Sequence, residues 1–198
     1  MKIREYVKKY IQQGINVERM LMENCMGDIE KIINEIFETY YNRGGSVFLF
    51  GNGGSASCCE HIAEELLNRL QNYRVPLSAL SLTSQPSIIT GIANDFGFEK
   101  VFSRQLEALA TPKDLVIALS TSGNSLNVIN GIRLARLRGV KTIGMTGING
   151  RNLINKVDIC LTVPSDNTSI IQEAHMIAGH IICAAVEEML FGEQGLDN

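Results

Sequence analysis

The sequence lacks tryptophan and has only three histidines, His61, His175 and His180, among its 198 residues. It also lacks an excess of charge of one sign, because 18 Lys and Arg face 21 Asp and Glu and the net charge is −3. Non-specific nucleic-acid binding needs a basic surface that replaces phosphate counterions, so this balance argues against a nucleic-acid partner. So few histidines also leave few residues for a metal site or a general base.

Long apolar runs and paired cysteines are absent as well. No uninterrupted apolar stretch approaches the roughly 18 residues of a membrane span, and the charged first twenty residues lack the apolar segment of a signal peptide. The five cysteines show no CxxC spacing, and the adjacent Cys58 and Cys59 suit neither a zinc ribbon nor a disulfide framework. We therefore expect a globular cytoplasmic protein without a membrane partner, whose cysteines are small buried residues.

Residues 1–43 are predicted to be helical, because apolar residues recur at helical spacing until Gly44 and Gly45 provide a stop signal. Beyond them, short apolar runs alternate with longer segments of helical spacing. This alternation is typical of βαβ crossovers and predicts an α/β fold, with a parallel sheet covered by helices on both faces. The expected strands are 47–50, 77–82, 115–119, 142–145 and 159–163, and the expected helices are 59–71, 98–110, 126–138 and 169–190.

No linker-like segment divides the chain, so residues 1–198 are expected to form one domain. The helical extension 1–43 has more apolar surface than a solvated arm needs. That surface predicts packing either against the sheet or against a helix of another subunit, and the sequence leaves both alternatives open.

A glycine-rich loop follows the first expected strand, where residues 51–55 read Gly-Asn-Gly-Gly-Ser. Its three glycines allow backbone amides to approach a ligand closely, and Ser55 can cap the next helix. A tight strand-to-helix turn without a ligand explains the same residues. The loop matches neither GxGxxG nor the P-loop pattern, which disfavours a dinucleotide or a nucleoside triphosphate.

A hydroxyl-rich loop follows the third expected strand, where residues 120–125 read Ser-Thr-Ser-Gly-Asn-Ser and open a helix. Ordinary helix capping explains one or two of the four hydroxyls, but not all of them. Hydroxyls, backbone amides and the helix dipole can together hold a phosphate dianion without a lysine. The loop therefore predicts a phosphate site.

Two helices carry the residues that could perform acid–base chemistry. His61 and Glu65 are four residues apart, so they share one face of the helix that follows the glycine-rich loop. The last expected helix carries Gln172, His175 and His180. A helical wheel separates the two histidines by about 140°, so only one of them faces a site squarely, and the wheel does not say which.

The segment 120–125 resembles the signature of sugar isomerase (SIS) domains, which bind phosphosugars. Residues 51–55, 61–66, 94–97 and 171–175 also stand in the order and approximate spacing of the phosphoheptose isomerases. The resemblance covers nearly the whole chain. It implies the flavodoxin-like SIS fold, a three-layer sandwich preceded by N-terminal helices, in a cytoplasmic homotetramer with active sites between subunits.

The resemblance also implies an activity. Phosphoheptose isomerases are aldose–ketose isomerases that convert sedoheptulose 7-phosphate to glycero-manno-heptose 7-phosphate in heptose biosynthesis, which supplies lipopolysaccharide. Such a reaction passes through an enediolate and needs a base near the C–H bond and an acid near the carbonyl oxygen.

The family's functional residues map onto positions in this sequence. The resemblance assigns catalysis to Glu65 and His180 and makes His175 a structural neighbour. It implies one zinc ion per subunit, bound by His61, Glu65, Gln172 and His180. It implies contacts with the sugar phosphate from Asn52, Gly53, Gly54, Glu65, Asn94, Asp95, Ser120, Thr121, Ser122, Ser125 and Gln172.

The sequence departs from the family pattern in two places. Cys58 stands where the family commonly has an aspartate, and Ile170 and Ile171 precede Gln172 where a charged or polar residue is usual. These changes bear on which sugar is accepted, so an isomerase for another ketose phosphate is one alternative. Another is a non-catalytic SIS module that binds a phosphosugar and a protein partner, as adaptors of the bacterial replication initiator do. A binding module needs no acid–base pair, so the presence of Glu65 with its partners favours catalysis.

Overall fold

The computed structural model describes residues 2–192. Its five strands form one parallel sheet in the order β2-β1-β3-β4-β5. The central strands β1 and β3 are buried at every position, as expected where helices cover both faces. The strands are β1 (Val47–Gly51), β2 (Ala79–Ser81), β3 (Leu115–Leu119), β4 (Lys141–Gly147) and β5 (Ile159–Val163).

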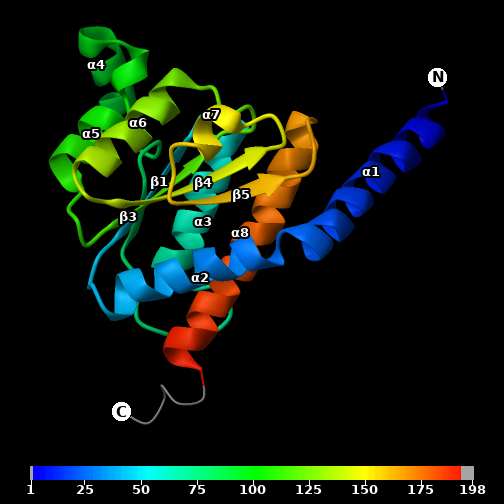
Figure 1. Ribbon diagram of the computed structural model, residues 1–198, viewed down its shortest axis with the longest axis horizontal. Helices are drawn as coiled ribbons and strands as arrows, with labels where there is room; N and C mark the ends of the chain where they lie inside the picture. The colour runs from blue at the N-terminus through cyan, green and yellow to red at the C-terminus, as the bar shows by residue number, and fades with distance from the viewer. Residues whose placement is uncertain (1, 193–198) are drawn as a thin grey trace.

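Helices form a layer on each side of the sheet, and each layer has its own core (Figure 1). The first layer contains α1 (Ile3–Asn24), α2 (Met26–Tyr41), α3 (Gly54–Leu67) and α8 (Thr168–Phe191). The second contains α4 (Pro86–Phe96), the 3-10 helix η1 (Phe98–Lys100), α5 (Ser103–Leu109), α6 (Leu126–Leu137) and α7 (Arg151–Ile154). The predicted three-layer α/β class, preceded by N-terminal helices, is confirmed.

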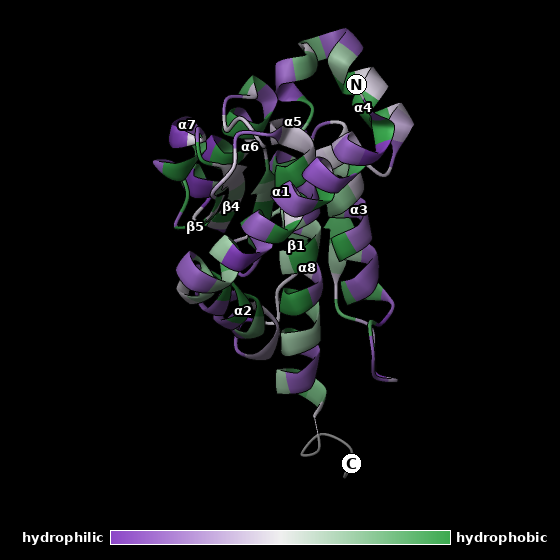
Figure 2. Cartoon of the chain, turned by 90° about the vertical axis from the view of Figure 1, so that its right-hand side faces the viewer, coloured by the Kyte–Doolittle hydropathy of each residue, from purple (hydrophilic) through white to green (hydrophobic). Residues whose placement is uncertain are grey.

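Helix α8 is the most apolar long helix of the first layer, and Figure 2 colours much of it as hydrophobic. Its length and apolar composition meet the criteria for a membrane-spanning helix, but the buried core helix of a soluble protein meets the same criteria. Here α8 packs against α1, α2 and α3, and its buried residues belong to the core of the first layer.

Several predicted elements differ from the observed ones. The N-terminal segment is two helices, because the backbone turns between α1 and α2 at Cys25, whose φ of −118° departs from the ideal helical value near −63°. Helix α3 begins at Gly54, five residues before the predicted start, since Gly53 adopts a positive φ of 54° and turns the chain. The prediction of one continuous helix over 98–110 was wrong, because this segment contains two separate helices, η1 and α5.

Helix α4 was not predicted. Pro86 at its first position favours its start, and Gly97 with φ 90° follows its end. Asn94 and Asp95 therefore lie in the last turn of a helix instead of in an Asn-Asp turn. None of its residues is fully buried, but Ile89, Ile92 and Ala93 recur at helical spacing and pack, partly buried, against the core of the second layer.

The strand order places both sequence-predicted loops at one point. The order reverses between β1, which continues to β2 on one side, and β3, which continues to β4 on the other. In open α/β sheets, ligands bind beyond the carboxyl ends of the strands at such a switch point. The glycine loop (residues 51–55) follows β1 and the hydroxyl loop (residues 120–125) follows β3, so the fold brings these two loops together.

Candidate active site

The hydroxyl loop is held in place by hydrogen bonds between its backbone and the end of β4. The amide of Ser120 donates to the carbonyl of Met145 at 3.0 Å, and the Thr146 hydroxyl donates to the carbonyl of Ser120 at 2.7 Å. Gly123 has a φ of 65°, and a Cβ there would lie 2.5 Å from the Cα of Gly150. The loop therefore has a fixed shape that only glycine allows at its tip.

The hydroxyls of this loop are not used to cap the helix that follows. Ser125 is the N-cap residue of α6, yet its side chain makes no capping hydrogen bond. Instead, the Ser120 hydroxyl donates to that of Ser125 at 3.4 Å, and the Ser122 hydroxyl accepts from the amide of Asn124 at 3.3 Å. Ordinary capping thus does not account for the serines, whereas a site for an anion at a helix N-terminus does.

Asn127 joins the two loops, and the sequence analysis missed it. Its side-chain amide and that of Asn52 donate to each other's oxygens at 2.8 and 2.9 Å. Asn127 is buried, and its oxygen also accepts from the amide of Val128 at 2.9 Å. The signal that could have revealed it was an amide residue in the first turn of the helix, directly after the hydroxyl loop. Asn127 fixes the orientation of Asn52, one of the expected sugar contacts.

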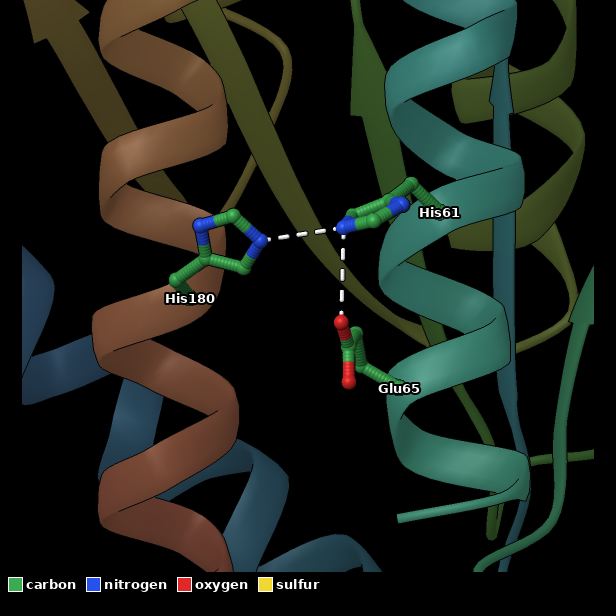
Figure 3. A group of neighbouring side chains, drawn as sticks. All are labelled: His61, Glu65 and His180. Carbon is green, nitrogen blue, oxygen red and sulfur yellow. Dashed lines mark hydrogen bonds and ion pairs between the residues drawn. The ribbon is translucent and has the colours of Figure 1, made fainter. Parts of the chain in front are cut away.

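Three side chains from α3 and α8 meet to form what we call the His–Glu–His group (Figure 3). The Nε2 atom of His61 lies 3.0 Å from Nε2 of His180 and 3.3 Å from Oε1 of Glu65. One ligand atom from each of the three residues lies within 4.8 Å of the others. The side chain of His61 is 45% exposed and that of Glu65 is 12% exposed, so the group is open to solvent at His61.

Gln172 and His175 lie apart from this group although α8 carries both. The side-chain amide of Gln172 lies beside Gly54, where a Cβ would come within 2.5 Å of its oxygen. Gly54 precedes His61 by seven residues, about 10 Å along α3. The structure thus places Gln172 next to the glycine loop, which suits its expected substrate contact.

His175 is fully buried, and neither of its ring nitrogens has a hydrogen-bond partner within residues 2–192. Burial lowers its pKa to about 4, and the nearby backbone of Thr146 raises it by a smaller amount. A histidine that stays neutral in the core suits a structural position, whereas His180 is exposed and belongs to the His–Glu–His group.

Asn94 and Asp95 are not brought to the His–Glu–His group. Both are exposed at the end of α4, where the Asn94 amide donates to Asp95 at 2.8 Å, and α4 lies on the other side of the sheet from α8 (Figure 1). The first turns of α4 do border a cavity of about 290 Å³ beside Asn52 and Gly53. That cavity opens next to the glycine loop, but Asn94 and Asp95 do not line it.

The free cysteines fit the structural role expected of them. Four of the five are buried, and Cys160 is partly buried. Burial raises the pKa of Cys58 and of Cys59, so both thiols stay protonated and unreactive near neutral pH.

A parallel sheet of this order, with a hydroxyl-rich loop at its switch point, defines an SIS-domain protein, and the SIS domain family matches residues 9–147. The phosphoheptose isomerase of Roseiflexus sp. is 46% identical over 183 residues, which cover 92% of each chain. The solved phosphoheptose isomerase of Francisella tularensis is 31% identical with a TM-score of 0.91, and the alignment covers 95% of this chain and 100% of that one. The corresponding structure from Neisseria gonorrhoeae is 30% identical with a TM-score of 0.89, and covers 94% and 100%. The chain therefore belongs to the phosphoheptose isomerase family of SIS-domain proteins.

Proposed function

We propose that this protein converts sedoheptulose 7-phosphate to glycero-manno-heptose 7-phosphate. Membership of the phosphoheptose isomerase family supports the aldose–ketose isomerase reaction. The observation that carries the catalytic assignment is the proximity of Glu65 and His180, which stand on different helices and come together with His61. An adaptor that only binds a phosphosugar has no use for such a group.

The reaction moves a proton between C1 and C2 while the hydroxyl and the carbonyl exchange places. Glu65 is the proposed base that takes the proton from one carbon and returns it to the other. His180 is the proposed acid–base partner that exchanges a proton with the substrate oxygen, so that the enediolate does not carry a full extra charge. The largely buried carboxylate and the exposed imidazole suit these two roles, because the first needs a fixed position and the second needs to exchange protons.

The His–Glu–His group also has the composition of a zinc site. Two imidazole nitrogens and a carboxylate oxygen are donors that zinc accepts, and they already lie within 4.8 Å of one another. We propose that His61, Glu65 and His180 hold one zinc ion per subunit. Gln172, the expected fourth ligand, lies beside Gly54 and would have to turn its side chain towards the group to bind the ion. When bound, the ion would polarise the substrate oxygens as a Lewis acid. A carboxylate that binds zinc tightly is a weaker base, so the two roles of Glu65 compete.

The hydroxyl loop is the proposed site of the phosphate group. Ser120, Thr121, Ser122 and Ser125 surround the N-terminus of α6, whose amides and dipole favour an anion. Asn52, Gly53 and Gly54 then lie along the sugar, with Gln172 beside them. Asn94 and Asp95 remain proposed sugar contacts that need a rearrangement of α4 or a second copy of the chain.

A second copy of the chain is the proposed partner that completes the site, in a homotetramer. Exposed apolar residues recur along α1 at Ile3, Val7, Ile11 and Ile15, and α1 extends away from the sheet (Figure 1). A cavity of about 360 Å³ between α1, α2 and α8 is lined mainly by apolar residues, one of which, Ile181, is next to His180. A subunit that covers this apolar surface would lie against the His–Glu–His group. The unpaired cysteines support a cytoplasmic enzyme, and its product would enter heptose biosynthesis for lipopolysaccharide.

The test is turnover of a panel of ketose phosphates with five to seven carbons, with and without added zinc, and product identification by NMR. We expect sedoheptulose 7-phosphate to give the highest kcat/KM, and zinc to raise it. Preferred turnover of a shorter ketose phosphate would reassign the substrate, in line with the departures at Cys58 and Ile170. No turnover of any member would replace the enzyme by a binding module.

A further inference from the structure

The carboxyl end of α3 is bound to α8 by a buried ion pair that the proposed chemistry does not use. Nε of Arg74 lies 2.8 Å from Oε2 of Glu187, and their side chains are only 2% and 1% exposed. Glu187 stands two turns after His180 on α8, and Arg74 belongs to the segment that follows α3. We call these two residues the Arg74–Glu187 pair.

Glu187 is saturated with hydrogen bonds from the segment after α3. Its carboxylate accepts from the backbone amides of Leu70, Gln71 and Asn72 at 3.0, 2.8 and 2.5 Å. Burial raises the pKa of Glu187, but these amides and Arg74 lower it more, so that the net shift is downward. The carboxylate is therefore charged near neutral pH, and it holds the segment against α8.

Arg74 connects this anchor to Glu65. Its Nη2 atom donates to the backbone carbonyl of Glu65 at 2.9 Å, while Nε is bonded to Glu187. The carbonyl of Glu65 is one of the last four of α3, which have no partner within the helix. No basic residue lies in the last turn of α3 and no glycine caps it, so the guanidinium takes over both functions.

We propose that Arg74 and Glu187 are positioning residues of the isomerase: they hold the turn that carries Glu65 at a fixed distance from His180. This inference rests on the proposed function, in which Glu65 is the base. The planar guanidinium reaches the carboxylate with one edge and the carbonyl with another, which a single ammonium group cannot do. Arg74→Lys therefore keeps the charge next to Glu187 but loses the bond to Glu65.

The Arg43–Glu35 pair provides a matched control. It is a less buried ion pair, at 2.7 Å, and Arg43 also donates to two backbone carbonyls, that of Glu35 within α2 and that of Lys113 before β3. It contacts none of the residues of the His–Glu–His group. Arg43→Lys therefore reports what the loss of an arginine fork costs without a connection to the site.

The experiment measures amide hydrogen exchange in the last turn of α3, together with kcat and KM for sedoheptulose 7-phosphate. For Arg74→Lys we expect at least tenfold faster exchange at residues 64–68, a kcat about tenfold lower and a KM within twofold. For Arg43→Lys we expect the exchange at residues 64–68, kcat and KM to be as in the wild-type protein. Glu187→Gln, which removes the charge and keeps the shape, should reproduce the Arg74→Lys pattern.

Two outcomes would overturn the proposal. One is unchanged exchange at residues 64–68 in both variants of the pair. The other is faster exchange with a kcat no lower than that of Arg43→Lys, which would make the pair purely structural. If the wild-type protein has no turnover, the proposed function fails instead, and the exchange arm alone tests whether the Arg74–Glu187 pair fixes this turn.

Discussion

The hydroxyl loop and the His–Glu–His group differ in how the protein holds them. The loop is built from backbone: hydrogen bonds to the end of β4 and a glycine of positive φ fix it within a single chain. The group is built from side chains on two helices and is open to solvent at His61, and His180 precedes Ile181, which lines an apolar cavity that residues 2–192 leave open. The proposed phosphate site therefore lies within one chain, whereas the proposed catalytic group stands at the edge of the proposed subunit contact.

This difference separates the effects of mutations. In the proposed site, a change in the loop removes a contact that the substrate makes before and during the reaction, so we expect it to act mainly on KM. A change in the His–Glu–His group removes a proposed contact with the reacting atoms, so we expect it to act mainly on kcat. The predictions below test this separation, from the largest expected effect to the smallest.

Glu65→Gln should have the largest effect, a fall in kcat of about a thousandfold with KM within threefold. The amide keeps the size and the helix position of Glu65 but cannot take a proton, and general acid–base catalysis contributes roughly 10²–10⁴-fold. Steady-state kinetics at saturating zinc measures both constants. The same preparation should bind inorganic phosphate as the wild-type protein does, because the loop is unaltered. Near-full activity of Glu65→Gln would show that another residue is the base.

The second prediction concerns His175, which lies where α8 packs against the end of β4. Its folded pKa of about 4 is below the unfolded value near 6.5, so the unfolded chain takes up the proton first as the pH falls. This residue should therefore cost stability progressively below pH 6.5, by about 2 kcal/mol between pH 7 and pH 5. Urea unfolding at pH 7 and pH 5 measures the free energy of unfolding. Between these pH values it should fall by about 2 kcal/mol less in His175→Leu than in the wild-type protein.

Asn167→Ala serves as the control for this pH effect, because Asn167 is the N-cap of α8 and its side chain accepts from the amide of Ser169 at 3.1 Å. It should lower the free energy of unfolding equally at both pH values. If His175→Leu showed the same pH dependence as the wild-type protein, the histidine would be protonated in the folded state, and its environment would be more polar than described here.

The sheet and the hydroxyl loop could be predicted from sequence because their signals are local. Each buried strand is a short apolar run, and the loop concentrates four hydroxyls directly after one of them. The His–Glu–His group is a different case. The spacing of His61 and Glu65 places these two on one helix face, but only the resemblance to the family pointed to His180 rather than His175, since the wheel alone was ambiguous.

The features that sequence analysis missed depend on contacts between distant segments. Asn127 acquires its role only because β1 and β3 are neighbours, which brings Asn52 to it. The Arg74–Glu187 pair joins residues 113 positions apart, and in the sequence each is one charged residue among many. Helix α4 is a different case: Ile89, Ile92 and Ala93 recur at helical spacing and are partly buried against the core, so the local signal was present and was not used.

Ser125→Ala is the third prediction and should raise KM for sedoheptulose 7-phosphate about tenfold with little change in kcat. A hydrogen bond to a charged group contributes about 1.5–3 kcal/mol, and 1.4 kcal/mol corresponds to a factor of ten. The free energy of unfolding should change by less than about 0.5 kcal/mol, because this N-cap hydroxyl makes no capping bond. Asn167→Ala should show the opposite pattern, a loss of about 1 kcal/mol in stability with KM within twofold. A stability loss in Ser125→Ala without a change in KM would instead make its hydroxyl an ordinary cap.

The smallest effect is expected on the other side of the sheet, where Arg133 and Arg136 lie exposed on α6. Arg133 lines a cavity of about 360 Å³ together with Lys100 and Arg104, so this basic face is the competing place for a phosphate group. We expect Arg133→Gln and Arg136→Gln to leave KM within twofold, because the proposed phosphate site is the hydroxyl loop, and the interaction of an exposed charge with a distant phosphate is screened by salt. Michaelis constants at 0.05 and 0.15 M salt measure this, with Ser125→Ala as the reference. A rise in KM for Arg133→Gln of at least tenfold, larger than that for Ser125→Ala, would place the phosphate in the cavity lined by Arg133 instead of at the hydroxyl loop. It would also contradict the expected difference between changes in the loop and changes in the His–Glu–His group, on which the other predictions depend.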